Sequence, residues 1–167
     1  MAANIDIFEG LKQDHDRHRA LFDQLEGAGD GQDDLNGQRA TLFEQLTKEL
    51  KGHAAAEEQA LYSTMMRKPE TTDETRHSVA EHYKIEEALN DIAATDMASD
   101  AWTEKFKQLK HDYLHHIDEE EDEHFPDFAK YLTEADERHM EKVFERRKRE
   151  ETAEAEVTPE RKEDAKE

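Results

Sequence analysis

Apolar residues recur along this chain at steps of three and four, which is the spacing of one face of an α-helix. Four helices are predicted on this pattern, over about residues 5–26, 35–67, 73–94 and 101–126. The second contains Gly52, where a kink is possible, and the fourth runs up to Pro126. We expect Pro126 to end or kink that helix, because proline lacks the backbone N–H of a helical turn. No sustained alternation of apolar and polar residues predicts a strand.

Turn and capping residues separate the predicted helices. A glycine-rich stretch at 27–31 breaks the chain after the first helix. Pro69 and the threonines that follow it end the second helix and offer a cap for the third, and Ser99 or Asp100 is the expected N-cap of the fourth. A fifth, shorter helix is predicted over 134–150. We therefore expect one all-α domain over 1–150 and a charged, disordered tail over 151–167.

The charge of the chain limits its partners. Its 167 residues carry a formal net charge of −21, and charged residues make up 40% of them. Such a chain repels phosphate backbones and anionic membrane surfaces, so we expect neither nucleic acid nor membrane as a partner. No apolar run approaches the roughly 20 residues of a membrane span, and the N-terminus lacks the features of a signal peptide. These features favour the cytoplasm and carry no information on oligomeric state.

The absence of cysteine contrasts with an abundance of histidine. Without cysteine, disulfides, thiolate metal sites and iron–sulfur clusters are excluded. Ten histidines remain to be placed, and two of them belong to a repeated motif, His-x-x-x-Glu-Glu, at 53–58 and 116–121. Residues four apart lie one turn apart on the same face of a helix. An imidazole and a carboxylate at this spacing can therefore bind the same metal ion.

The predicted helices direct these residues into the bundle. His53 and His116 continue the apolar faces of their helices, and His15 and His82 do the same on the other two. A single inward histidine is ordinarily a hydrogen-bonded core residue, and one His/Glu pair can be a simple ion pair. Four histidines and two glutamates at one depth would be costly without a common partner, which a pair of metal ions supplies. The candidate ligands are His15, His53, Glu57, His82, His116 and Glu120.

The other histidines are expected elsewhere. His18 shares the inward face with His15, so it could be a ligand, a support for a ligand or neither. Three tyrosines, Tyr62, Tyr83 and Tyr113, are candidates to support the ligands. Five histidines are expected to face solvent or to support ligands from outside: His77, His111, His115, His124 and His139.

These motifs resemble the hemerythrin-like or HHE cation-binding domain. The resemblance covers about residues 5–148 and rests on the inward His15, the block from His53 to Tyr62, the pair Glu81-His82, and the block from His116 to Pro126. It implies an up-down antiparallel four-helix bundle around two iron ions, bridged by carboxylates and by an oxo or hydroxo group. Imidazole and carboxylate ligands also suit zinc and manganese, and the resemblance favours iron.

One departure from the resemblance bears on function. Oxygen-carrying hemerythrins supply two histidines from the third helix, one turn apart. Here the residues one turn before and one turn after His82 are Ser78 and Glu86, so this helix supplies a single histidine at that position. Four histidines leave open coordination positions, which Glu86 could partly fill, while Glu121 is a rival to Glu120 as ligand. The leading hypothesis is a di-iron protein that binds or reacts with dioxygen, peroxide or nitric oxide, with turnover of peroxide or nitric oxide as its enzymatic form. The alternatives are iron storage or handling without turnover, and a metal-free helical interaction bundle.

Overall fold

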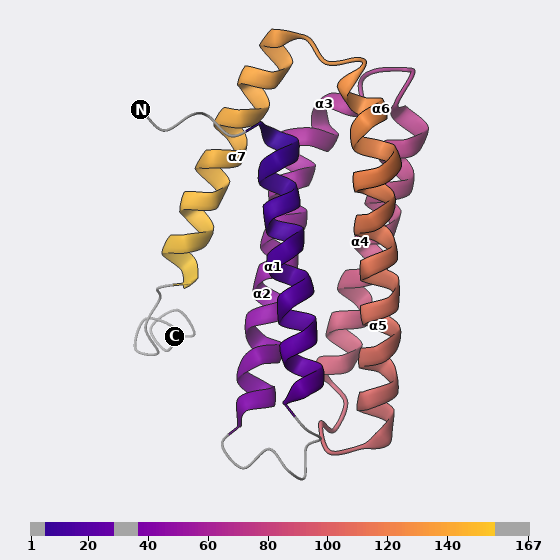
Figure 1. The fold of residues 1–167 in the computed structure, drawn as a ribbon, viewed down its shortest axis with the longest axis vertical. Helices are drawn as coiled ribbons and strands as arrows, with labels where there is room; N and C mark the ends of the chain where they lie inside the picture. Colours follow the sequence, from indigo (N-terminus) through magenta and orange to yellow (C-terminus); the bar gives the residue numbers. More distant parts are fainter. Residues whose placement is uncertain (1–5, 29–36, 156–167) are drawn as a thin grey trace.

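The computed structural model describes residues 6–28 and 37–155, and this part of the chain is helical without strands. Four long helices run alternately up and down and form an antiparallel bundle (Figure 1). They are α1 (Ile7–Gly27), α2 (Gln38–Glu57), α4 (Thr72–Ala93) and α5 (Asp100–Glu119). The short α3 (Ser63–Met65) and α6 (Phe125–Ala129) lie at one end of the bundle, and α7 (Glu134–Ala155) returns along its outside. The expected all-α bundle is confirmed.

The helix ends lie close to the predicted positions. Ser99 caps α5, because its hydroxyl accepts a hydrogen bond from the Trp102 N–H at 3.2 Å. Thr71 precedes α4 but makes no side-chain cap, since its hydroxyl donates to the Met65 carbonyl at 2.8 Å instead. None of the helices in residues 6–28 and 37–155 is long and apolar enough to cross a membrane.

Two π-helical turns interrupt the helices, and the sequence pattern did not predict them. They are η1 (Glu58–Tyr62) and η2 (Glu120–His124), so each begins at a glutamate of a His-x-x-x-Glu-Glu block. Each turn closes with a hydrogen bond to the carbonyl five residues back, from the Ser63 N–H to Glu58 and from the Phe125 N–H to Glu120. Single π turns inside α-helices are frequent at functional sites.

The helices are not interrupted at Gly52 or ended at Pro126, where the sequence suggested a break. Gly52 lies within α2, and the interruption of that helix comes after Glu57. Pro126 does not end its helix, because the chain stays helical through it to Ala129. It occupies one of the first two positions of α6, where a missing N–H is tolerated.

The interior of the bundle is divided into two apolar clusters. One contains Phe22, Leu46, Leu89 and Trp102, and the other contains Leu11, Leu61, Met65 and Phe128. Along the chain, buried polar side chains separate the residues of the two clusters, within α1 itself and, for α2 and α5, before the helical turns that follow them. On α1, for example, Asp14, His15 and His18 lie between Leu11 and Leu21. A polar layer thus crosses the bundle between two apolar ends.

Helix α7 is packed onto α1 and η1 rather than held apart from the bundle. Met140 and Val143 are buried in the second cluster beside residues of α1 and η1. Gly10 allows this close approach, because a Cβ atom there would lie 2.9 Å from the ring of Phe144. The helix continues to Ala155, beyond the predicted end at 150, so the expected tail is helical over 151–155. The rest of that tail, 156–167, lies outside the described residues.

The packing of α7 predicts that Met140→Ala will destabilise the whole domain. Met140 has no exposed surface, so truncation leaves a cavity that costs about 2–5 kcal/mol. Chemical denaturation monitored by circular dichroism measures this loss. Arg138→Ala, on the exposed face of the same helix, is the matched control and should be neutral. Equal stability of both variants would mean that α7 contributes nothing to the fold.

Candidate metal centre

All six predicted ligands meet in the polar layer. Their ligand atoms form two groups, and within each group these atoms lie within 4.8 Å of one another. The first group contains Glu57, His82, His116 and Glu120, and the second contains His15, His53 and Glu57. All six side chains are buried. The structure thus brings the predicted residues together, although their role as ligands stays a prediction.

Glu57 belongs to both groups. Its Oε1 atom lies 2.9 Å from Nε2 of His82, and its Oε2 atom lies 3.6 Å from Nε2 of His53. One carboxylate oxygen therefore faces each group, which is the arrangement of a carboxylate that bridges two ions. Glu120 contacts Nε2 of His116 and belongs to the first group alone. A bridging role for Glu120 stays a prediction.

Each of the four histidines donates its other ring nitrogen to a carboxylate on a neighbouring helix. The Nδ1 bonds are from His53 to Asp14 at 3.0 Å, His82 to Glu58 at 3.3 Å, His116 to Glu81 at 2.7 Å and His15 to Glu121 at 2.8 Å. The order follows the helices around the bundle. Asp14 of α1 holds the histidine of α2, and Glu58 of η1 holds the histidine of α4. Glu81 of α4 holds the histidine of α5, and Glu121 of η2 holds the histidine of α1, which closes a ring of carboxylates. This carboxylate ring fixes the orientation of every imidazole and leaves Nε2 for the centre of the bundle.

The ring follows a regular rule that the sequence analysis missed. Glu58 and Glu121, the second glutamates of the two repeated blocks, hold His82 and His15. The remaining two histidines are held by Asp14 and Glu81, the acids that directly precede His15 and His82 in the sequence. The sequence features that mark these four acids are the second glutamate of each repeated block and the acid directly before His15 and His82. They do not reveal which histidine each acid reaches, because the partners lie 24 to 106 residues apart.

Several atoms of the layer make no hydrogen bond within the described part of the chain, apart from the ion-pair contacts between imidazoles and carboxylates given above. They are Nε2 of His15, His53 and His116, and both carboxylate oxygens of Glu57 and Glu120. A buried polar atom without any partner costs about 1–3 kcal/mol, and imidazole–carboxylate ion pairs offset only part of the cost of burying the others. All these atoms face the interior of the layer, and imidazole nitrogens and carboxylate oxygens are ligands of borderline divalent cations. The donor set therefore fits bound metal.

The ionisable groups of the layer perturb one another strongly. Burial acts to lower the pKa of His53, but the Glu57 and Asp14 carboxylates outweigh it and raise that pKa to about 10. The pKa of His116 is likewise raised to about 10 against burial, chiefly by Glu120. Burial would raise the pKa of Glu57, yet the adjacent His53 and His82 hold it well below its usual range. Positive charge in the layer thus stabilises its carboxylates.

His18 and two tyrosines border the layer. Nδ1 of His18 lies 2.6 Å from the Tyr113 hydroxyl, and burial together with His53 lowers the pKa of His18 to about 2. His18 is therefore neutral, and it belongs to neither ligand group. Tyr62 and Tyr113 are buried, as expected of supporting residues. Tyr83, the third candidate, is 64% exposed, because it lies next to His82 in sequence but on another face of α4.

The residues flanking His82 take different positions. Ser78 is buried, and its hydroxyl lies 3.1 Å from Nδ1 of His124. His124 is buried too, so it does not face solvent, and its ring contacts Ser78 and Glu119. Glu86 is exposed and belongs to neither ligand group. The remaining four histidines of the outer set, His77, His111, His115 and His139, are exposed as expected.

Comparison with known proteins agrees with this geometry. Residues 6–128 match the family described as the hemerythrin HHE cation binding domain. The matched segment contains all four long helices, the polar layer and the carboxylate ring, and it ends before α7. No curated protein and no solved structure matches the chain.

The carboxylate ring predicts that Asp14→Asn will weaken metal binding about 10–100-fold. An asparagine can still accept the hydrogen bond from Nδ1 of His53, but it lacks the charge that makes the imidazole a stronger ligand. Competition with a chelator of known affinity measures the change. Asp16→Asn is the matched control, because Asp16 is exposed on the same helix. If both variants retained wild-type affinity, the ring would have no part in metal binding.

Proposed function

Because this chain belongs to the hemerythrin HHE cation-binding family, we propose that its polar layer holds two iron ions and binds or reacts with a small oxidant. The observation that carries the proposal is the pair of ligand groups that share Glu57. Each group contains two histidines, and each Glu57 oxygen faces one group. The ligand set lacks thiolate, which favours iron, zinc or manganese, and the family favours iron.

The number of ligands supports a site with room for an exogenous molecule. The second group offers His15, His53 and one oxygen of Glu57, which is fewer than the six ligands of an octahedral ion. Ser78 stands one turn before His82 and contacts His124, so it adds no ligand there. When bound, iron supplies redox equivalents and open coordination positions for dioxygen, peroxide or nitric oxide.

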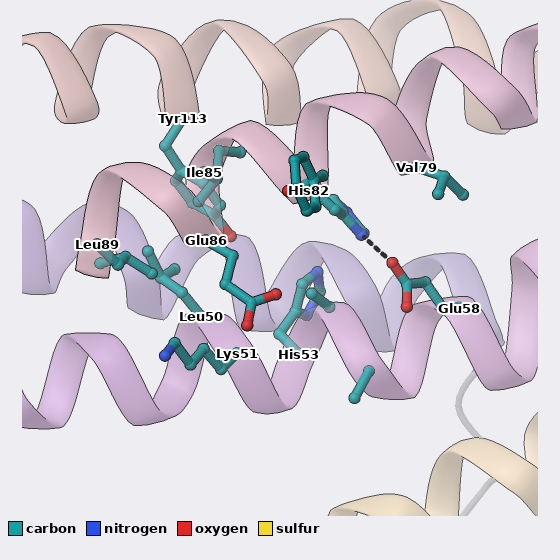
Figure 2. A pocket seen from close by; sticks show the side chains of 13 residues that line it. Leu50, Lys51, His53, Glu58, Val79, His82, Ile85, Glu86, Leu89 and Tyr113 are labelled. Atoms are coloured by element: carbon teal, nitrogen blue, oxygen red, sulfur yellow. Dashed lines mark hydrogen bonds and ion pairs between the residues drawn. The ribbon is translucent and has the colours of Figure 1, made fainter. Parts of the chain in front are cut away.

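A cavity of about 430 Å³ between α2 and α4 gives small molecules a route to this layer. Its wall includes His53, His82 and Tyr113, so it reaches both ligand groups. In Figure 2, Glu86 of α4 and Lys51 of α2 stand on opposite sides of this cavity. A cavity of this volume has ample room for a diatomic molecule or peroxide.

Tyr62 offers a proton donor to a molecule bound in the layer. Its hydroxyl is buried without a hydrogen-bond partner among the described residues. Burial, together with Glu120 and Glu57, raises the pKa of Tyr62 well above its usual value, so the hydroxyl stays protonated. An O–H group in this position can stabilise negative charge that develops on a bound oxidant.

The proposal predicts about two irons per chain after anaerobic loading with Fe²⁺ and gel filtration. His53→Ala removes a ligand of the second group and should lower the iron content by at least one equivalent. His111→Ala, an exposed histidine of α5, should bind iron like the wild type. Iron analysis by mass spectrometry measures all three proteins. Saturation at a single iron in the wild type would contradict a dinuclear centre.

A second experiment separates reaction with an oxidant from simple iron handling. Iron-loaded, reduced protein should change its near-ultraviolet and visible spectrum when dioxygen, peroxide or nitric oxide is added. Protein loaded with Zn²⁺ is the control, and its spectrum should not change, because zinc has no accessible redox state. If the spectrum of the iron-loaded protein does not change with any of the three molecules, storage or handling of iron is the better explanation.

A further inference from the structure

A second cluster of histidines and glutamates lies outside the polar layer, between α4 and α5. It repeats the same spacing, because His77 precedes Glu81 by four residues and His115 precedes Glu119 by four. The Nε2 atom of His77 contacts Glu81 and lies 3.4 Å from Oε1 of Glu119. We call His77, Glu81 and Glu119 the outer triad. Their ligand atoms lie within 4.8 Å of one another.

Glu119 lies at the centre of this cluster. Nε2 of His124 is 3.2 Å from the same Oε1 atom that faces His77, and Nε2 of His115 is 3.5 Å from Oε2. The other nitrogen of His124 is already engaged with the Ser78 hydroxyl, which orients its ring. Three imidazoles from two segments thus converge on one carboxylate.

The outer triad shares a residue with the carboxylate ring. Glu81 contacts His77 through Oε1, while its Oε2 atom accepts the hydrogen bond from Nδ1 of His116 at 2.7 Å. His116 in turn presents Nε2 to the centre of the bundle. One carboxylate side chain therefore joins the outer triad to a ligand of the inner centre.

The outer triad is open to ions from solvent. His77 is about half exposed, with 54% of its side chain accessible, while Glu81 and Glu119 are about one-fifth exposed. A cavity of about 270 Å³ adjoins them, lined by His77, Glu81 and His115 among others. Lys84 and Asp112 also line it, so one lysine stands beside the carboxylates of Glu81 and Asp112 in the cavity wall, and Glu119 adds a third carboxylate at the triad. The balance favours a cation.

We propose that the outer triad is a second cation site, which takes one divalent transition-metal ion such as Zn²⁺ and is coupled to the inner centre through Glu81. Metal–nitrogen and metal–oxygen bonds of about 2.1 Å place the ligand atoms of a tetrahedral ion about 3.4 Å apart. The His77–Glu119 separation has this value, and the half-exposed His77 side chain can adjust its distance to Glu81. Water completes the coordination from the adjoining cavity.

The coupling follows from the chemistry of a shared carboxylate. A cation bound to Oε1 of Glu81 withdraws negative charge from Oε2, so the hydrogen bond to His116 weakens. His116 then becomes a poorer donor to a metal ion at the centre, because partners of this kind raise the basicity of a ligating imidazole. Occupancy of the outer triad should therefore alter the inner centre without any movement of the helices.

Binding at the outer triad is tested with Co²⁺ alone as the probe, by equilibrium dialysis and visible absorption. Wild-type protein should bind one more Co²⁺ than either His77→Ala or Glu119→Gln, whereas His111→Ala should match the wild type. His53→Ala should lose ions of the inner centre and keep the ion of the outer triad. This pattern separates the two sites, so a failure of the inner centre to bind two irons leaves the outer triad testable.

Coupling is tested by adding Zn²⁺ to iron-loaded protein while the iron content is measured before and after. The iron spectrum should shift in the wild type, with no iron lost, and should not shift in His77→Ala. Equal Co²⁺ binding by wild type, His77→Ala and Glu119→Gln would overturn the outer site and leave the imidazoles as simple ion-pair partners of Glu119. Zn²⁺ binding without a spectral shift would overturn the coupling.

Discussion

The structure depends on one constraint: ionisable groups are buried in a layer halfway along a bundle whose two ends are apolar. Glu57 and Glu120 have no accessible surface, and the only contacts printed for their oxygens among the described residues are ion pairs with the surrounding imidazoles. Domains of this size are stable by only about 5–15 kcal/mol, and burying several charged groups costs desolvation energy that their ion pairs offset only in part. A cation at the centre removes that cost, because it binds to the folded arrangement of ligands and not to the unfolded chain. We therefore expect folding and metal binding to be linked in this protein.

The carboxylate ring shows how a highly acidic chain builds such a layer. Four acids, one from each long helix or from the π turn that follows it, each hold a histidine of the next helix. The carboxylate ring directs the four Nε2 atoms inward, and its own four carboxylates lie on the outer side of the imidazoles. Two π turns accompany the same blocks, so the first glutamate of each block faces the centre while the second reaches a neighbouring helix. The outer triad extends this arrangement by one more carboxylate-histidine contact, through Glu81.

The sequence predicted much of this arrangement, and the misses have physical causes. Helical periodicity identified the four long helices and the six residues that meet in the layer, because spacing along one helix determines which face a residue occupies. It could not identify the carboxylate ring, since each pair joins two helices and depends on their packing. The two π turns were not predicted, because the spacing of apolar residues does not distinguish a single π turn from the α-helix around it. Tyr83 is exposed, and its residue type, not its helical face, suggested a supporting role.

The proposed function rests on two metal ions that Glu57 would bridge in the polar layer. Iron-edge X-ray absorption on the iron-loaded protein tests this arrangement, because the scattering reports both the ligands and the neighbouring iron. We expect nitrogen and oxygen ligands only, with a second iron about 3.5–4 Å away. This iron–iron signal should disappear in Glu57→Gln. A wild-type spectrum with no iron neighbour at that distance, at full loading, would mean that the layer does not hold a dinuclear centre.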